Sequence, residues 1–213
     1  MCSFDEELNN FIILHEGKKN LRYFDKYGNR TIGIGFNLEA KNAKNIVENW
    51  LNLSYKKVYD GKIKLTDRQI DILYCYSHGQ ALKDAQQFCP SFNSLHRRRQ
   101  IVLIDMAYNL GFARLATFKN LQKALANKNW NKAADEIINS KWYKQVGVRG
   151  EDNQYVMRHA EMPPRCKKTA KANNLSINYN LAALMQNTIW YKRHELAQPR
   201  IIPSNIQRRY NEI

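Results

Sequence analysis

The stretch from Glu16 to Phe36 is the feature that most restricts how this chain can fold. It combines an acid at the end of an amphipathic segment with two short strand-like runs, 21–26 and 31–36, on either side of Tyr27-Gly28-Asn29. Gly and Asn readily adopt the left-handed conformation that a tight loop requires. The stretch therefore predicts a helix end that runs directly into a β-hairpin.

The segment before Glu16 has the signals of a helix. Ser3 and Glu6 form the S-x-x-E pattern of a capping box, which satisfies free N–H groups at a helix start. Gly17 predicts the helix end just past Glu16. Apolar residues recur between these signals at helical spacing, namely Phe4, Leu8, Phe11 and Ile12.

A hairpin centred on Gly28 would place Asp25 directly opposite Thr31. The strand face that carries Thr31 would otherwise hold only Gly33 and Gly35, which leaves room for a ligand, while Ile32, Ile34 and Phe36 would lie on the other face. An acid at a helix end that faces an acid and a hydroxyl suits acid-base chemistry on a bound molecule.

Each of these polar residues also has a purely structural interpretation. Glu16 could be a solvated charge at a helix end, Asp25 a turn residue with an Asx-type bond, and Thr31 an ordinary strand former. Taken singly, each structural interpretation is favoured. Their combination with glycines at the positions where side chains would block access favours a site.

Three motifs in this stretch resemble the signature of T-even type phage lysozymes, the muramidases of glycoside hydrolase family twenty-four. The motifs are His15-Glu16-Gly17, Tyr23-Phe24-Asp25 and Thr31-Ile32-Gly33-Ile34-Gly35, and their spacing matches that of the family's catalytic Glu, Asp and Thr. Later segments resemble the family's second lobe in the same order: Met106 to Gly111, Phe118, 130–138 and Ser140-Lys141-Trp142-Tyr143. The likeness covers roughly the first three quarters of the chain.

The resemblance implies an α+β, lysozyme-like fold with a small N-terminal lobe that holds the hairpin, a connecting helix and a helical C-terminal lobe. The expected lysozyme-like domain spans residues 1–162, with a first lobe over 1–62, a linking helix over 66–78 and a helical lobe over 80–162. Thr66-Asp67 supplies the cap of the linking helix, and Ser77 to Gly79 is expected to break it. Residues 163–213 form a basic, partly helical extension, with a helix expected around 181–188.

The helical lobe is expected to centre on the apolar run from Ile101 to Leu110, which only Asp105 and Asn109 interrupt. A run of this length without Pro or Gly predicts a helix that is buried on nearly all sides. Arg97-Arg98-Arg99, just before it, is interpreted as a solvated cluster.

The catalytic roles follow from the resemblance. Glu16 corresponds to the general acid, and Asp25 with Thr31 to the pair that holds and activates a water, which implies hydrolysis with inversion. The resemblance also implies substrate-binding positions, at Gly35, Phe36, Asn109, Phe118 and Arg149.

Two of these positions depart from the family pattern, and a third raises a conflict. Asn109 stands where the family usually has Gln, and Phe36 where it often has His. Arg149 corresponds to an arginine beside the catalytic Glu, although a surface cation in a loop is an equal interpretation. A nearby arginine would oppose the protonated form of Glu16, which burial favours.

The implied activity is that of an endolysin or muramidase, which hydrolyses the β-1,4 bond between N-acetylmuramic acid and N-acetylglucosamine in peptidoglycan. One alternative is a lytic transglycosylase, which needs the acid but no activated water; the presence of Asp25 and Thr31 argues against it. Another is a non-catalytic lysozyme-fold protein that binds the envelope or nucleic acid. A binding relic would not need to keep the acid, the base and the hydroxyl together.

Composition points to anionic partners. The chain has 34 Lys and Arg against 19 Asp and Glu, a net charge of +15, which attracts polyanions. The sequence contains no zinc-finger spacing, RNP motif or basic region with heptads, so we expect no nucleic-acid partner. Peptidoglycan is the expected partner of the site, and anionic envelope polymers or a membrane surface are the expected partners of the basic surface and tail.

No metal, cofactor or second subunit is expected. Cysteines stand at 2, 75, 89 and 166, without C-x-x-C spacing or nearby histidine pairs, so they are interpreted as ordinary thiols, with Cys75 in the core and any disulfide left open. The N-terminus is acidic where a secretory signal would be basic and then apolar. We therefore expect synthesis in a cytoplasm and action at the bacterial cell wall after release or delivery.

Overall fold

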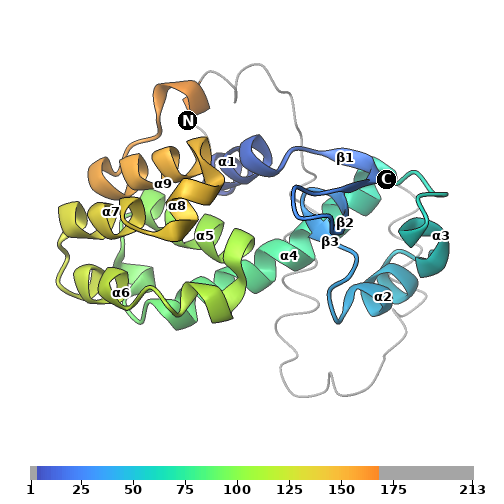
Figure 1. Cartoon of the computed structure of the whole chain (residues 1–213), viewed down its shortest axis with the longest axis horizontal. Coiled ribbons are helices and arrows are strands. Elements are labelled where there is room, and N and C mark those ends of the chain that lie inside the picture. The colour runs from blue at the N-terminus through green and yellow to red at the C-terminus, as the bar shows by residue number, and fades with distance from the viewer. Residues whose placement is uncertain (1–3, 168–213) are drawn as a thin grey trace. The chain divides into compact units, whose positions relative to one another are not determined.

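A computed structural model describes residues 4–167 of the chain, which form helices around a small sheet (Figure 1). The order of elements is α1 (Phe4–Glu16), β1 (Lys19–Phe24), β2 (Arg30–Gly33), β3 (Phe36–Asn37), α2 (Ala43–Asn45), the π-helical turn η1 (Ile46–Trp50), α3 (Tyr55–Tyr59), α4 (Asp67–Phe88), the 3₁₀ turn η2 (Phe92–Ser94), α5 (Arg97–Leu115), α6 (Lys119–Ala126), α7 (Trp130–Ile138), α8 (Lys141–Val146) and α9 (Val148–His159).

The described residues form two lobes along the long helix α4. The sheet lies with α2 and α3 at one end of α4, and α5 to α9 gather at the other (Figure 1). Helix α1 packs against α5, whereas β2 and β3 pack on α4. Because α1 ends where the sheet begins, its C-terminal residue lies between the helical lobe and the sheet.

The sheet has three antiparallel strands in the order β1-β2-β3, and its hairpin register differs from the prediction. Tyr23, not Asp25, lies opposite Thr31, and Phe24 lies opposite Arg30. The Asp25 amide donates to the Asn29 carbonyl at 3.0 Å, which closes the turn around residue 27. The predicted pairing of Asp25 with Thr31 is wrong because Asp25 begins the turn and does not belong to the strand.

The predicted strand over 31–36 is also interrupted. Strand β2 ends at Gly33, and the chain turns back through Ile34 and Gly35 so that Phe36 of β3 pairs with Ile32. Gly33 and Gly35 have φ of 68° and 69°, which residues other than glycine rarely adopt. The face of Thr31 is not bare, because a Cβ on Gly33 would contact Ile70 of α4 at 3.4 Å.

Helix α4 is longer than the predicted linking helix over 66–78. It begins with the expected cap, in which the side chains of Thr66 and Gln69 form a capping box, and then continues for 22 residues. The predicted break at Ser77 to Gly79 is wrong. A glycine inside a helix costs only about 1 kcal/mol relative to alanine, and the packing of α4 along α5 outweighs it.

Helix α5 confirms the predicted buried helix at the centre of the second lobe. Every residue from Ile101 to Ala107 is buried, including Asp105. The helical path is interrupted at Gly111, which has φ 69° and ψ 164°. The buried stretch therefore ends before Gly111, and Asn109 near its end is exposed.

The arginines at the start of α5 are not the solvated cluster that the sequence predicted. Arg98 donates through Nη2 to Glu7 of α1 at 2.8 Å, and Arg99 donates through Nε to the Met157 carbonyl of α9 at 2.8 Å. Both side chains are partly buried. They join α5 to its two neighbours because the start of α5 lies against both helices.

The first residues of the predicted extension contact the helical lobe. Pro163 and Cys166 are buried, and Arg165 donates through Nε to Asp152 of α9 at 2.8 Å. The predicted boundary between residues 162 and 163 remains a prediction. The helix predicted around 181–188 and the remainder of the extension lie outside the described residues, as do Cys2 and Ser3, the first residue of the predicted capping box. No single helix within 4–167 is both long and apolar enough to cross a membrane.

Candidate active site

Glu16 is fixed at the end of α1 by a helix stop and a close backbone contact. The Gly17 amide donates to the Ile13 carbonyl at 2.8 Å, and Gly17 has φ 71°, as a glycine C-cap requires. The Glu16 side chain is 17% exposed. It lies against Gly35, where an added Cβ would be 2.6 Å from Oε2. Gly35 thus makes room for the carboxyl group.

Arg149 holds the other side of Glu16, so the structure brings these two predicted residues together. Its Nη1 donates to Glu16 Oε1 at 2.5 Å, while its Nε and Nη2 donate to Asp105 at 2.9 and 2.8 Å. The guanidinium is buried. Burial lowers the pKa of Arg149, but Asp105 and then Glu16 more than offset this, so the pKa is raised. Arg149 is a permanent buried cation between two carboxyl groups, not a surface cation in a loop.

Asp25 organises the hairpin turn with its own side chain. Its Oδ1 accepts from the amides of Tyr27 and Asn29 at 2.8 and 2.9 Å, and its Oδ2 accepts from Asn29 Nδ2 at 2.9 Å. Partial burial would raise the pKa of Asp25, but the hydrogen bonds from the Asn29 side chain and from the turn amides lower it overall. Asp25 is therefore ionised at neutral pH, and Oδ2 keeps acceptor capacity for a further donor.

Thr31 connects to the same turn from the next strand. Its hydroxyl donates to the Asn29 carbonyl at 3.3 Å, and the residue is 4% exposed. Asn29 therefore bonds to both Asp25 and Thr31, which the hairpin register alone does not pair. The sequence interpretation missed Asn29; its signal was a turn position between two candidate site residues.

Three of the predicted substrate-binding residues differ in exposure. Phe36 is 5% exposed and packs edge-to-face on Tyr76 of α4, so its role in substrate binding remains a prediction. Asn109 is exposed, and its Oδ1 accepts from Trp142 Nε1 at 2.8 Å, which leaves the amide N–H groups available. Phe118 precedes α6 and packs against the core. Within residues 4–167 no hydrogen bond or ring contact connects Phe118 to Glu16, Asp25 or Arg149.

Two tyrosines, Tyr23 and Tyr108, lie near Glu16, whose charge acts on both. The Tyr108 hydroxyl of α5 donates to the Ile34 carbonyl at 2.5 Å, beside Gly35, and so ties the helical lobe to the turn below Glu16. Tyr23 of β1 has its pKa raised to about 12, mainly by burial and next by the charges of Glu16 and Asp25. Both hydroxyls remain protonated at neutral pH and can donate hydrogen bonds.

His15 precedes Glu16 in α1, and its side chain is buried with no hydrogen-bond partner at Nε2. That atom is 3.4 Å from Asp152 Oδ2, a contact that lacks hydrogen-bond geometry. Burial is the largest influence and lowers the pKa of His15; Asp105 and Asp152 oppose it, and Arg149 and Arg165 add to it. The net lowering means that burial prevails over the nearby carboxylates, so His15 is neutral at pH 7 in the folded protein.

The buried His15 should make stability depend on pH. Its folded pKa lies below the unfolded value of 6.5, so the unfolded chain binds the proton more readily. The free energy of unfolding should then decrease as pH falls through about 6.5 toward 5, by at most about 1.4 kcal/mol per pH unit. Urea unfolding of wild type and His15→Gln over this range tests it: the variant should lose part of this dependence, whereas His159→Gln, which changes an exposed histidine, should retain it. An unchanged dependence in His15→Gln would contradict the assignment.

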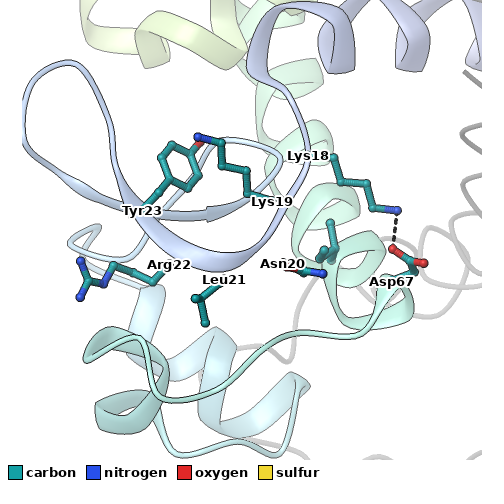
Figure 2. Close-up of a pocket in the computed structure, with 8 residues that line it drawn as sticks. Lys18, Lys19, Asn20, Leu21, Arg22, Tyr23 and Asp67 are labelled. Carbon is teal, nitrogen blue, oxygen red and sulfur yellow. Dashed lines mark ion pairs between the residues drawn. The ribbon is translucent and has the colours of Figure 1, made fainter.

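A basic groove runs along β1, the edge strand of the sheet (Figure 2). Its volume is about 580 Å³, and it is lined by Lys18, Lys19, Asn20, Leu21, Arg22, Tyr23, Asp67 and Ile70. Lys18 pairs with Asp67 at 2.8 Å, whereas the Lys19 ammonium lies over the Tyr23 ring, 4.3 Å from its centroid. The groove does not include Glu16, so it is a surface beside the candidate site and not its centre.

Three cysteines, Cys75, Cys89 and Cys166, lie within residues 4–167. Burial, followed by a nearby aspartate, raises the pKa of Cys75 and of Cys166 to about 12, so both are protonated at neutral pH and are poor nucleophiles. Both are free, as is Cys89; Cys89 and Cys166 are buried, whereas Cys75, predicted in the core, is only partly buried. In the same part of the chain no group of three His, Cys, Asp or Glu side chains is arranged to hold a metal ion.

The sequence interpretation gave no role to Asp105. It lies in α5 with 0% exposure and accepts hydrogen bonds from Arg149 and, at 2.7 Å, from Asn153 Nδ2. The signal that could have found it was a lone acid inside an apolar helical run, because a buried carboxylate needs a charged or hydrogen-bonding partner.

The fold and the site together define a class. A small antiparallel sheet, a long connecting helix and a helical lobe, with a carboxyl at the end of the first helix between them, form a lysozyme-like α+β protein. No protein-family model matches the chain. Two curated proteins of Dictyostelium discoideum do. The chain is 27% identical over 141 residues to "Probable T4-type lysozyme 2" and 28% identical over 143 residues to "Probable T4-type lysozyme 1".

Each alignment covers 63% of this chain and 83% of the relative. The chain is therefore similar to T4-type lysozymes over most of their length. At the level of the family the comparisons support a lysozyme-like glycosidase.

Proposed function

We propose that the protein is a muramidase that hydrolyses the β-1,4 bond between N-acetylmuramic acid and N-acetylglucosamine in peptidoglycan. The observation that carries this proposal is the position of Glu16, a partly buried carboxyl held between Arg149 and Gly35 at the junction of the two lobes. Asp25, ionised on the neighbouring hairpin, provides the second carboxyl that glycoside hydrolysis requires.

Glu16 acts as the general acid. The glycosidic bond breaks through an oxocarbenium-like state, so the leaving oxygen must gain a proton as the bond to C1 breaks. Glu16 donates that proton to the leaving oxygen. Gly35 and Arg149 restrict the carboxyl to one position, which is how an acid gains effective concentration at the reacting oxygen.

Asp25 and Thr31 hold the attacking water. The low pKa of Asp25 makes it a weak base, so its main contribution is to orient the water and to stabilise positive charge at C1, and it accepts the proton that the water releases as the new C–O bond forms. Asp25 Oδ2 has free acceptor capacity for this water. The Thr31 hydroxyl is connected to Asp25 through Asn29, which hydrogen-bonds to both residues. Attack from the face opposite Glu16 inverts the configuration at C1, for which the two carboxyls are expected about 6.5 to 9.5 Å apart.

Product analysis tests the reaction type. Purified peptidoglycan is digested with the wild-type protein, and the fragments are separated and weighed. Hydrolysis leaves reducing N-acetylmuramic acid ends, first as the α anomer if the reaction inverts, and proton NMR during the digest identifies that anomer. Anhydro-sugar ends would instead establish a lytic transglycosylase, and undigested peptidoglycan would refute a catalytic role.

Asp25→Asn should separate catalysis from turn formation. The amide oxygen still accepts from the amides of Tyr27 and Asn29, and Asn is suited to Asx turns, so only the bond from Asn29 Nδ2 is lost and the unfolding free energy should fall by about 1 kcal/mol. The lost charge should lower the rate by about 10²-fold or more. Thr31→Ala removes one hydroxyl and should have a milder effect. Lysis of cell walls and urea unfolding of both variants measure this; a larger activity loss in Thr31→Ala than in Asp25→Asn would contradict the assignment.

The basic surface is proposed to attach the enzyme to anionic polymers of the envelope, where it acts after release or delivery from the cytoplasm in which it is made. Residues 18–30 carry five cations, Lys18, Lys19, Arg22, Lys26 and Arg30, against Asp25 alone. The groove of Figure 2 lies along this segment, next to the hairpin that holds Asp25. Attraction there would raise the local concentration of enzyme on its substrate.

The same proposal covers the basic residues 163–213, and we propose a monomer without a nucleic-acid partner.

Binding to insoluble cell walls at increasing salt tests the attachment. The Lys19→Gln/Arg22→Gln pair should bind less than wild type at low salt, and the difference should vanish above a few hundred millimolar, because the Debye length falls to about 3 Å at 1 M. Lys41→Gln/Lys44→Gln removes two exposed cations outside the groove and serves as the matched control. Equal losses in the two pairs would show that net charge, not this groove, is responsible.

A further inference from the structure

The carboxylate of Asp105 is a buried charge that the proposed mechanism does not use. It lies in the middle of α5 within the run Ile101 to Ala107, whose other members are all apolar. A carboxylate in such a place is strongly unfavourable unless hydrogen bonds and an opposite charge compensate it. Packing alone gives no reason for an acid at this position.

The hydrogen bonds of Arg149 are divided unequally between its two carboxyl partners. Nε and Nη2 point side by side at the two oxygens of Asp105, at 2.9 and 2.8 Å, and Nη2 also approaches the Asp105 carbonyl at 3.3 Å. Only Nη1 reaches Glu16. The bidentate pair is the stronger arrangement, and Asn153 Nδ2 fixes it by donating to Asp105 Oδ2 and to the Arg149 carbonyl.

We propose that Asp105 is a positioning residue that neutralises Arg149 and so allows Glu16 to keep its proton for catalysis. The proposal rests on the function of Glu16 as general acid. An uncompensated guanidinium beside Glu16 would favour the ionised form, which has no proton to donate. Paired with Asp105, Arg149 still orients Glu16 through Nη1 but presents little net charge to it. This resolves the conflict between a buried general acid and its arginine neighbour.

The other groups around Glu16 do not provide this compensation. Tyr23 of β1 and Tyr108 of α5 both have raised pKa values, chiefly because they are buried, so they are neutral at pH 7. His15, the preceding residue of α1, is neutral there because burial lowers its pKa. Asp25 adds negative charge from the hairpin, where its carboxyl accepts from the Tyr27 and Asn29 amides and from the Asn29 side chain. The compensation that acts directly on Arg149 therefore comes from α5.

The test is the pH dependence of peptidoglycan hydrolysis in wild type, Asp105→Asn and Asp105→Asn/Arg149→Gln. The high-pH decline of activity, where the general acid loses its proton, should move to lower pH by about one unit or more in Asp105→Asn. It should return toward the wild-type position in the double variant, which lacks both charges. Asp84→Asn, which changes a buried acid on α4, is the matched control and should leave the decline unmoved.

A purely structural role predicts a different result. Asp105→Asn would then lose activity by the same factor at every pH, with the decline unmoved, and this outcome overturns the proposal. If Asp105→Asn does not fold, Arg149→Gln alone tests the reverse: the uncompensated Asp105 should hold the proton on Glu16 to higher pH. If the high-pH decline of activity in Arg149→Gln stays at the wild-type pH or moves to lower pH, the proposal is refuted.

A readout independent of activity separates this inference from the proposed function. The carboxyl ¹³C signal of Glu16, assigned by its loss in Glu16→Gln, reports protonation directly in wild type and Asp105→Asn. A lower midpoint in Asp105→Asn supports the proposal, and an equal midpoint overturns it. Wild-type protein that leaves peptidoglycan intact would refute the proposed function while the NMR titration still decides the electrostatic role of Asp105.

Discussion

A Glu16→Gln variant is expected to hydrolyse peptidoglycan about 10² to 10⁴ times more slowly than wild type at neutral pH, with its fold unchanged. Glutamine has nearly the same shape but carries no acidic proton, so protonation of the leaving oxygen is lost. Arg149 keeps its bidentate partner Asp105, and the amide oxygen of the new side chain can still accept from Nη1. The buried cation therefore stays compensated, and the unfolding free energy should change by about 1 kcal/mol or less.

The turbidity of purified cell walls measures the rate of hydrolysis, and urea unfolding of the same preparations measures the unfolding free energy. Glu48→Gln is the matched control, because Glu48 is an exposed acid on η1 and its replacement changes net charge equally. Control activity should equal that of wild type. Substantial lysis by Glu16→Gln would remove Glu16 from the mechanism, and an unfolded variant would mean that its carboxylate is needed for the buried pair with Arg149.

The end of α1 was predictable from sequence because local signals determine it. The helical spacing of Leu8, Phe11 and Ile12 marks the buried face, and all three residues are buried in the structure. Gly17 then ends the helix through a bond from its own amide. The cap at Thr66 was predictable for the same reason, since a capping box lies within four consecutive residues.

The hairpin register was not predictable from the position of Gly28 alone. A turn is defined by the bonds that close it, and here the Asp25 side chain accepts from two amides within the loop. This places the centre of the hairpin one residue before Gly28, at Tyr27, and brings Tyr23 opposite Thr31. The structural interpretation of Asp25 as an Asx-type turn residue is correct, and it is compatible with a catalytic role because Oδ2 keeps acceptor capacity.

The length of α4 and the role of Asp105 both depend on tertiary contacts. The signals at Ser77 to Gly79 were real, but packing along α5 keeps that stretch helical. Asp105 accepts a hydrogen bond from Arg149, which lies 44 positions later in the chain. Periodicity identifies which face of α5 is buried; it cannot say which distant cation reaches a lone acid on that face. The pairing of Arg149 with Glu16 came from the family resemblance and not from the residue pattern.

Gly35→Ala is expected to lower peptidoglycan hydrolysis by about 10²-fold, because misplacement of a catalytic group by about 1 Å has an effect of that size. The new Cβ would lie 2.6 Å from Glu16 Oε2, closer than non-bonded atoms approach. Arg149 Nη1 holds the other oxygen of Glu16, so the carboxyl cannot move aside freely. Either that hydrogen bond lengthens or the turn at Gly35 shifts, and both displace the acid from the leaving oxygen.

Gly28→Ala separates this effect from backbone strain. Gly35 and Gly28 have φ of 69° and 83°, so alanine at either position should lower the unfolding free energy by about 1 to 2 kcal/mol through left-handed strain. A Cβ on Gly28, however, would meet nothing within 4 Å. Hydrolysis and urea unfolding should therefore show a loss of stability in both variants, at least as large in Gly35→Ala, and a large loss of activity only in Gly35→Ala. Equal activities would mean that close contact between Gly35 and Glu16 does not position the acid.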